Sequence, residues 1–506
     1  MTKMFIGTDS TGAGCVKITK GNINPYNEPD ANTSSFYYNS KVAADVKLAA
    51  TDSQPFVNGR AYLPSGTNIN SYKKAYDKNS LNGAFLIAMR NTNFPDLPYS
   101  LPLFDIKTRR LSNDRYIEIS RVRRDGSDDN RGQRTSYFET FDRGTSMWFE
   151  NRPQTNAAAE QWVGAVGNGI LYYGDRYAST DANQFEKGLI VWRLPGDNTP
   201  ILDGTPKAPV AGQRSVEITK DFCRVAKPGY DVRTATPTQL AFDSAGRPLS
   251  AIGADDINLP AGVSSYNLGF PVTANMLADV FLYSGEALTF PMSRRGTSLE
   301  CEYWFSGSSI FFNNTQSSAV RCRFIVFAND RSPLTTGTNK VFRQFNAGGQ
   351  NVMQLLRPGA GANPAFRDIM LDSRWPCIQI LAEGYRTIAS RSNVEPSNQN
   401  TGQSFEVNIN ADGVFPVVKY MTVHQHPTVG KLVKFAQTLI TQNYRGSPTY
   451  HQGNSSYCEI EGNVARFWTF RGNPQSEQYT DSRGWEYEYP VDPIIGIRYY
   501  ILGIPQ

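Results

Sequence analysis

The sequence has few of the residues and runs that mark membrane, metal-binding or catalytic proteins. Histidine occurs three times in 506 residues, and the six cysteines form no CxxC pair. No run of about 18 apolar residues is present, which excludes a transmembrane helix. The charged fraction is 19% and the net charge of +5 is dilute over this length. Composition alone therefore indicates neither a zinc module nor a nucleic-acid partner.

The common catalytic motifs are also missing. The sequence contains no GxSxG elbow, Walker A loop, HExxH motif or complete GxGxxG motif. The glycine cluster at 164–169 precedes a strand-like segment at 170–173, whereas a phosphate-binding loop should open a helix. We interpret this cluster as a turn. The sequence predicts a protein that is not an enzyme, with no catalytic, cofactor-binding or metal-binding residues.

The N-terminus and the cysteines indicate a reducing compartment. The first seven residues contain an apolar run of only three, Met4 to Ile6, where a signal peptide needs about 7–15. We therefore expect folding in a cytoplasm and reduced, mostly buried thiols. Cys301 and Cys322 lie on predicted strands that could come close, yet no disulfide is expected between them. The cysteines are Cys15, Cys223, Cys301, Cys322, Cys377 and Cys458.

Aromatic residues are abundant and favour strands. Phenylalanine occurs 28 times and tyrosine 26 times, and aromatics make up 12% of the chain. Several segments alternate apolar and polar residues with a period of two, which is typical of antiparallel strands with one face on a core. These segments are 116–123, 216–219, 299–305, 320–327 and 405–410.

One segment has helical spacing. Between Lys431 and Tyr444 the apolar residues fall on one stripe, and glycines stand at 430 and 446. The stripe consists of Leu432, Phe435, Ala436, Leu439 and Ile440. The predicted fold class is therefore mainly β, with tandem antiparallel β-sandwich-like modules and one C-terminal helix at 431–444.

Three stretches look like copies of one unit: Cys15–Ser40, Cys223–Ser244 and Met353–Ser373. Each is an apolar strand, a basic residue near a glycine, a loop, an apolar return and Asn-Ser or Asp-Ser. Glycine permits the positive φ that ends a strand sharply, and Asn or Asp ends the return strand by bonding to nearby backbone. Each copy is later followed by a closing strand, and Pro/Gly/Thr-rich stretches separate the copies. We therefore predict an N-terminal β-module at 1–207, a central β-module at 208–338 and a C-terminal β-module at 339–506.

These stretches resemble a module of tailed-bacteriophage structural proteins. The resemblance is carried by Arg224–Asp231 with Leu240–Ser244, by Leu371–Pro376 and by the C-terminal Ile497–Pro505. It covers about 60 residues in several pieces, and the first copy departs from it because Thr19-Lys20-Gly21 lacks the proline. The resemblance implies a virion protein and assigns no catalytic residues.

On this resemblance we expect a non-enzymatic structural component of a phage tail, in the tail tip, baseplate or fibre apparatus. It would dock other virion tail proteins, support host adsorption and be located in the virion after assembly in the host cytoplasm. Two alternatives stay open: a receptor-binding or polysaccharide-degrading tail protein, and a head decoration or collar protein. The expected partners are other tail proteins, further copies of the chain and a host surface receptor, with no nucleic acid and no membrane insertion.

Two constellations have both a chemical and a plain structural interpretation. His424 and His426 share a strand face and could meet one metal ion, but only His451 is left as a third imidazole. We favour a polar strand end before Pro427. The segment Trp485–Tyr489 places three aromatics on one face and two glutamates on the other, a pattern compatible with sugar binding or glycoside hydrolysis. We favour aromatics in the core and glutamates in water.

Clustered aromatics also favour an oligomer. Tyr303–Phe305 with Phe311-Phe312, and Trp485–Tyr489 with Tyr499-Tyr500, place many aromatic residues in short hairpins. Such residues concentrate binding energy in interfaces. We expect interfaces well above about 1,000 Å² with other copies or other tail proteins.

Overall fold

The structure is a computed structural model of the whole chain, and the following account concerns the residues whose placement it defines. These residues are 3–41, 48–55, 69–74, 84–90, 101–110, 113–120, 134–141, 146–153, 161–165, 170–175, 185–201, 208, 210–219, 222–236, 239–243, 251–272, 276–285, 287–290, 299–314, 316–327, 333–338, 341–375, 378–388, 403–426, 430–435, 440–442, 450–452, 454–471, 479–480, 486–487 and 494–505.

The predicted β class is confirmed. Strands dominate, and the described part of the chain contains no α-helix, only short 3₁₀ turns such as η1 (Thr33–Ser35) and η5 (Phe366–Asp368). Each of the five segments with alternating patterns overlaps a strand, and residues 121–123 of the first lie outside the described residues. Within the described residues, no helix is long and apolar enough to cross a bilayer.

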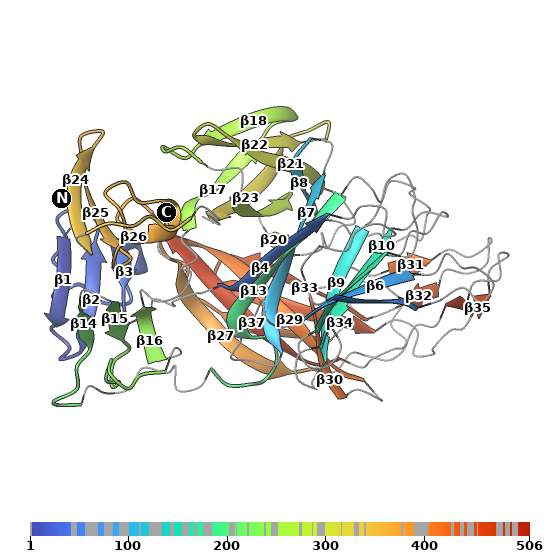
Figure 1. Ribbon diagram of the computed structural model, residues 1–506, viewed down its shortest axis with the longest axis horizontal. Coiled ribbons are helices and arrows are strands. Elements are labelled where there is room, and N and C mark those ends of the chain that lie inside the picture. The colour runs from blue at the N-terminus through green and yellow to red at the C-terminus, as the bar shows by residue number, and fades with distance from the viewer. Residues whose placement is uncertain are drawn as a thin grey trace.

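A sandwich of two sheets forms one side of the larger part of the molecule (Figure 1). The first sheet has seven strands in the order β18 (Gly262–Asn267), β22 (Ser309–Asn314), β21 (Leu299–Ser306), β8 (Arg115–Ser120), β7 (Pro102–Arg110), β13 (Phe185–Pro195) and β4 (Leu48–Pro55). The second has three strands in the order β17 (Ala251–Leu259), β23 (Val320–Phe327) and β19 (Leu277–Tyr283). Both are antiparallel.

Strand β19 is buried on both faces, which explains its nearly continuous apolar sequence LADVFLY. One face of the three-stranded sheet, including Val280 and Phe324, packs against Tyr303 and Phe312 of the seven-stranded sheet. The opposite face, including Phe281, joins a second core that is shared with strands near the C-terminus. The three-stranded sheet is therefore the middle layer of the larger part.

The remaining strands form the other side of this part. A ten-stranded sheet has the order β27 (Gln379–Thr387), β37 (Ile494–Pro505), β29 (Val414–His426), β30 (Gly430–Phe435), β9 (Arg134–Phe141), β10 (Ser146–Pro153), β11 (Gln161–Ala165), β12 (Ile170–Asp175), β6 (Ala84–Arg90) and β5 (Ile69–Lys74). A four-stranded sheet has the order β20 (Leu288–Phe290), β33 (Asn454–Glu461), β34 (Val464–Arg471) and β28 (Gln403–Asn408). Two short pairs are β31 (Ile440–Gln442) with β32 (Tyr450–Gln452), and β35 (Tyr479–Thr480) with β36 (Glu486–Tyr487).

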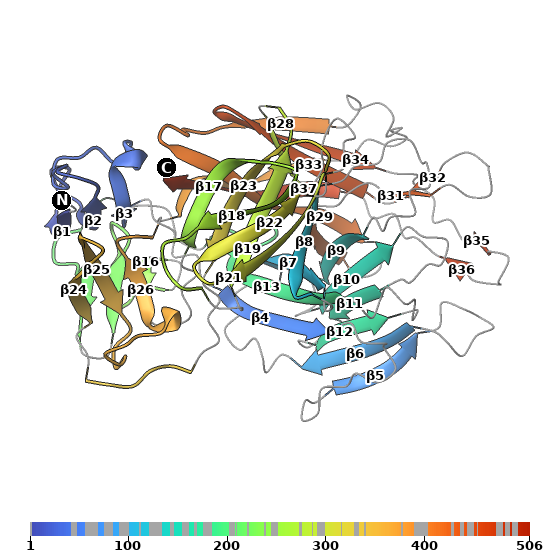
Figure 2. The same cartoon turned by 90° about the horizontal axis from the view of Figure 1, so that it is seen from above.

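A separate group of three small sheets lies at one end of the molecule (Figures 1 and 2). We call it the three-sheet unit. Its sheets are β1 (Lys3–Thr8), β2 (Gly14–Thr19) and β3 (Phe36–Asn39); β14 (Val216–Ile218), β15 (Cys223–Ala226) and β16 (Leu240–Asp243); and β24 (Phe342–Ala347), β25 (Gln350–Leu356) and β26 (Ile369–Asp372). The unit thus collects three segments of the chain, which end and begin at residues 39 and 216 and at residues 243 and 342.

The predicted C-terminal helix at 431–444 is wrong. Residues 430–435 form β30, which pairs with β29 and β9, and 440–442 form β31; the remaining positions lie outside the described residues. The fully buried residue of β30 is Val433, which is not part of the apolar stripe. Pairing with two neighbouring strands overrides the helical spacing here.

The large sheets draw strands from more than one of the segments 1–207, 208–338 and 339–506. The seven-stranded sheet joins β8 to β21, and the ten-stranded sheet joins β9 to β30. Neighbouring strands in these sheets are therefore often distant in the sequence.

Candidate interaction site

The three sheets of the three-sheet unit share one hydrogen-bonding pattern. In each, the second strand pairs with the first and the third, and a register shift interrupts the second pairing at the same place. The shift follows Ile18, Val225 and Leu355, which are therefore equivalent positions. The predicted repeat of strand, turn and return segment is confirmed as local structure.

The register of the strand pairing also corrects the alignment of the first copy with the other two. Because Ile18 matches Val225 and Leu355, it is Val16 and not Cys15 that matches Cys223 and Met353. The offset arises because Lys20 is followed directly by glycine, whereas the other two copies have a proline in between.

The turn after the second strand is built alike in all copies. Gly21, Gly229 and Gly359 have φ values of 56°, 85° and 76°, in the left-handed region that side chains with a Cβ rarely adopt. The preceding basic residues donate their backbone N–H across the loop in every copy. These bonds run from Lys20 to Ser35 O (2.9 Å), from Lys227 to Gln239 O (2.9 Å) and from Arg357 to Asp368 O (2.7 Å).

In the first and third copies, the terminal serine bonds back to the backbone of the second strand. The Ser40 hydroxyl accepts from the Val16 backbone N–H at 2.9 Å, and the Ser40 N–H donates to Val16 O at 2.9 Å. Ser373 and Met353 repeat both bonds, at 3.0 and 2.9 Å. The third serine, Ser244, lies outside the described residues.

The three sheets pack their apolar faces around one shared core. Equivalent residues of each second and third strand meet there, namely Ile18, Val225 and Leu355 with Tyr38, Phe242 and Leu371. A hollow lined only by apolar side chains from all three sheets opens beside this core. Its lining consists of Met4, Ile6, Val16, Tyr38, Val216, Ile218, Cys223, Val225, Phe242, Leu355 and Leu371.

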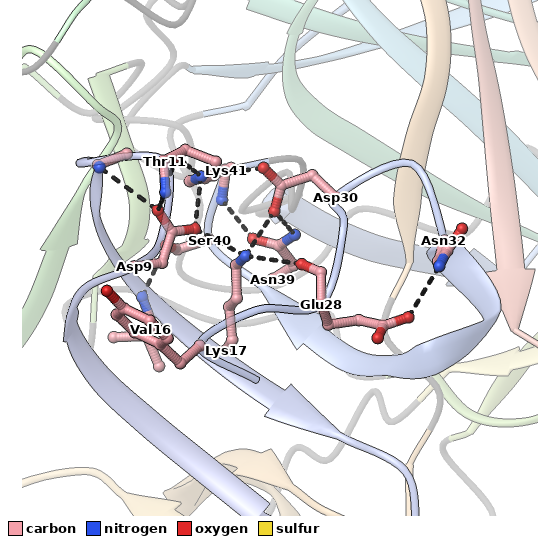
Figure 3. Close-up of polar contacts among 12 residues, drawn as sticks. Asp9, Thr11, Val16, Lys17, Glu28, Asp30, Asn32, Asn39, Ser40 and Lys41 are labelled. Atoms are coloured by element: carbon pink, nitrogen blue, oxygen red, sulfur yellow. Dashed lines mark hydrogen bonds and ion pairs between the residues drawn. The ribbon is translucent and has the colours of Figure 1, made fainter. Parts of the chain in front are cut away.

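A ring of alternating charges stiffens the first copy (Figure 3). The Lys17 ammonium lies 2.7 Å from the Asp9 carboxylate and 2.8 Å from Asp30, and the Lys41 ammonium lies 2.6 Å and 2.9 Å from the same two groups. Asp9 and Lys17 are almost fully buried. Asn39 donates to Asp30 at 2.8 Å. The ring therefore ties the loops around β2 and β3 together.

The ring changes the acidity of its members. Burial alone would raise the pKa of Asp9, but hydrogen bonds from Lys17, Lys41 and Thr11 outweigh burial and hold that pKa well below its usual range. The pKa of Asp30 is lowered by the same balance, in which Lys17, Lys41 and Asn39 outweigh burial. Burial would lower the pKa of Lys17, whereas Asp30 and Asp9 raise it. Asp9, Lys17 and Asp30 are thus charged near neutral pH.

We expect the first copy to loosen in acid. A carboxyl with a depressed pKa stabilises the fold above its unfolded pKa of about 3.9, and this stabilisation is lost as the pH falls through the folded value. Hydrogen exchange of β2, measured between pH 5 and pH 2 and corrected for intrinsic rates, should therefore accelerate more than exchange of β15. The Asp9→Asn, Asp30→Asn double variant should lose this pH dependence. An unchanged slope in that variant would contradict the prediction.

The other two copies replace the ring with smaller polar networks. The position of Lys17 is taken by Arg224, which pairs with Asp243 at 3.2 Å and is about one third exposed. In the third copy it is taken by Gln354, which donates to the buried Asp372. The three sheets are therefore alike in backbone and core but not in their outer polar face.

The unit is fixed to the larger part mainly through the third copy. Phe366 and Trp375 of this copy and Phe270 of the sandwich form an aromatic cluster with ring centroids 5.7–6.2 Å apart. The fully buried Asp368 accepts from Arg357 at 2.9 Å and from the Thr335 hydroxyl at 2.6 Å. These contacts hold the loop that faces the sandwich.

The backbone places the candidate metal-binding histidines on two different sheets. His424 and His426 end β29, where the backbone pairs them with Leu432 and Gly430, and His451 lies on β32 in a different sheet. Their side chains lie outside the described residues. Among the residues that are described, no cluster of three or more His, Cys, Asp or Glu is placed to bind a metal.

The aromatic clusters contribute mostly to the cores. Tyr303, Phe312 and Tyr500 are fully buried. On the outer face of the same sheet, Trp304 stacks on Phe311 at 5.4 Å and Arg115 covers Trp304 at 3.9 Å. Of the segment 485–489, only the backbone of Glu486 and Tyr487 in β36 is described.

Five cysteines are free and buried, and Cys377 lies outside the described residues. Cys301 and Cys322 both enter the sandwich core as free thiols. Burial raises the pKa of Cys15 and of Cys223 to about 11, with a further contribution from nearby aspartates. These thiols are therefore packing residues with little thiolate at neutral pH.

The interaction features of the unit were missed by sequence reasoning. The four charged residues of the ring, Asp9, Lys17, Asp30 and Lys41, are spread over 33 positions, and no spacing rule links them. The apolar alternation in the first strands was a usable signal, because Met4 and Ile6 repeat the pattern of Val216 and Ile218. It was recognised for the second copy only.

Comparisons with known proteins identify no family. No protein-family model matches the chain, and no curated protein matches it. A solved structure of Lactobacillus farciminis oxalate decarboxylase in complex with formate was returned with a TM-score of 0.10 and 9% identity, covering 55% of this chain and 89% of that chain. A likeness this weak says nothing about the fold or the function of the present chain.

Proposed function

We propose that this protein is a non-enzymatic structural component of a phage tail and that it docks other virion proteins through the three-sheet unit. The observation that carries the proposal is the unit itself. Three segments with the phage-like sequence pattern, distant in the chain, assemble around one core beside a small apolar hollow, where Ile6 and Ile218 are exposed. A monomer has no evident use for exposed apolar side chains around such a hollow, whereas an assembly partner would cover them.

The build of the unit supports a mechanical role. Its residues are held by backbone ladders, by a ring of four charges in which Asp9 and Lys17 are buried, and by the Arg357–Asp368 pair, all of which resist local opening. The aromatic contact with Phe270 joins the unit to the layered sheets of the larger part. Force applied at the unit would be transmitted through packed β-structure.

The test is quantitative mass spectrometry of gradient-purified phage particles, followed by separation of tails from heads. The proposal predicts that the protein is present at a fixed small copy number and stays with the tail fraction. Recovery with heads would favour a decoration or collar protein, and clearing of host polysaccharide by the purified protein would favour a degrading tail protein. Absence from particles would overturn the proposal.

A further inference from the structure

The far end of the three-sheet unit presents three open strand edges. The first strands β1, β14 and β24 each pair on one side only, and all three lie farthest from the larger part (Figures 1 and 2). The third strands lie nearest to it. An edge strand offers unpaired N–H and C=O groups to another chain. One chain thus supplies three like edges at the same end.

Exposed apolar side chains accompany these edges. Ile6 on β1, Ile218 on β14 and Phe342 on β24 are 45%, 49% and 43% exposed. Ile6 and Ile218 occupy equivalent positions and line the mouth of the apolar hollow. The third copy has Gln344 at that position, and its exposed apolar residue stands two places earlier on the same face. Each sheet therefore offers one large exposed apolar side chain on its first strand.

The charges at this end have one prevailing sign. Each edge has one basic side chain on it or directly beside it: Lys3, Arg214 and Arg343. The only acidic residue in the three first strands is Glu217, and Arg214 pairs with it at 3.0 Å. Lys3 and Arg343 therefore leave a small excess of positive charge at this end, which an acidic partner would complement and a second copy of the same end would not.

From these observations we infer that the far end of the unit is a docking surface for a homotrimeric, acidic virion protein, with one copy of this chain per trimer. The inference rests on the proposed function. A closed trimer presents the same patch three times around its axis, and three like sheets in one chain meet all three patches. Each partner subunit would place an apolar side chain against one sheet, and its acidic groups would face Lys3 and Arg343, because Arg214 already pairs with Glu217.

Cross-linking in assembled particles tests whether the three sheets contact equivalent patches of one partner protein. A photoreactive phenylalanine analogue is placed in turn at the positions of Ile6, Ile218 and Phe342, and particles carrying each variant are irradiated and digested. The expected result is one partner protein, cross-linked through the same peptide from all three positions. Different proteins, unrelated peptides, another copy of this chain, or no cross-link in particles that contain the protein would each overturn the inference. Absence of the protein from particles would instead overturn the proposed function.

Introducing a charge at this surface and measuring incorporation into particles gives an independent test. Ile218→Asp should reduce incorporation into particles at least tenfold, because it places a carboxylate among apolar side chains and facing an acidic partner. Val263→Asp is the matched control: Val263 is 60% exposed on β18, outside the three-sheet unit, and its replacement should leave incorporation unchanged. Circular dichroism of both purified variants confirms folding. Equal incorporation of the two folded variants would contradict the inference.

Discussion

Replacing Lys419 by Met should destabilise the layered sheets by about 3–5 kcal/mol, the cost typical of a buried charge that loses its partner. The Lys419 ammonium lies 2.7 Å from Asp279, and both side chains are about 95% buried. Lys419 lies on β29 and Asp279 on β19, so the pair joins the middle layer to the ten-stranded sheet. The ammonium also lies 4.5 Å from the Trp192 ring centroid, which adds a cation–π contact.

The double variant separates the charge effect from packing. Asp279→Leu alone should cost a similar amount, whereas Lys419→Met with Asp279→Leu should cost less than either single change, since no unpaired charge remains. Denaturant unfolding, together with hydrogen exchange of β19 and β29, measures the loss of stability in the single and double variants. Arg466→Met, which removes an exposed pair with Glu406, is the control and should cost under about 1 kcal/mol. Additive losses in the double variant would refute this account of the pair.

In the three-sheet unit, Lys17→Met should be the most damaging single change, at about 3 kcal/mol for a buried ion pair broken on one side. It leaves Asp9 and Asp30 with Lys41 as the remaining cation of the ring. The matched control is Arg224→Met, at the equivalent position of the second sheet. Its pair with Asp243 is partly exposed, so the loss should stay near 1 kcal/mol or less.

Hydrogen exchange of the second strands β2 and β15 measures the effects of Lys17→Met and Arg224→Met. Lys17→Met should release β2, and Arg224→Met should leave β15 close to the unsubstituted protein. Equal protection losses in the two variants would show that the ring contributes no more than a surface pair.

Local features of the fold could be predicted from the sequence. Alternation with a period of two is enough to find strands such as β21 and β23, because one face of each enters a core. Gly229 and Gly359 mark turns because their positive φ is costly for residues with a Cβ. These signals lie within a few residues of each other, so one sequence is enough to show them.

Long-range arrangement could not be predicted in the same way. Nothing in the sequence of β2, β15 and β25 states that they share one core, because apolar strands fit many partners equally well. The helical stripe at 431–444 was misleading for the same reason. Val433 lies on a strand that pairs with β29 and β9, and nothing in its own segment specifies these partners. The candidate site depends on such pairings, and its ring of charges depends on loop ends that meet only after folding.

A reconstruction of the intact particle tests the central claim most directly. The claim is that one chain uses three like sheets to bind a tail assembly. The account predicts density for this protein in the tail, with the ends of β1, β14 and β24 each touching an equivalent subunit of one trimer. Density that leaves these three edges in solvent, or that places this protein outside the particle, would contradict it.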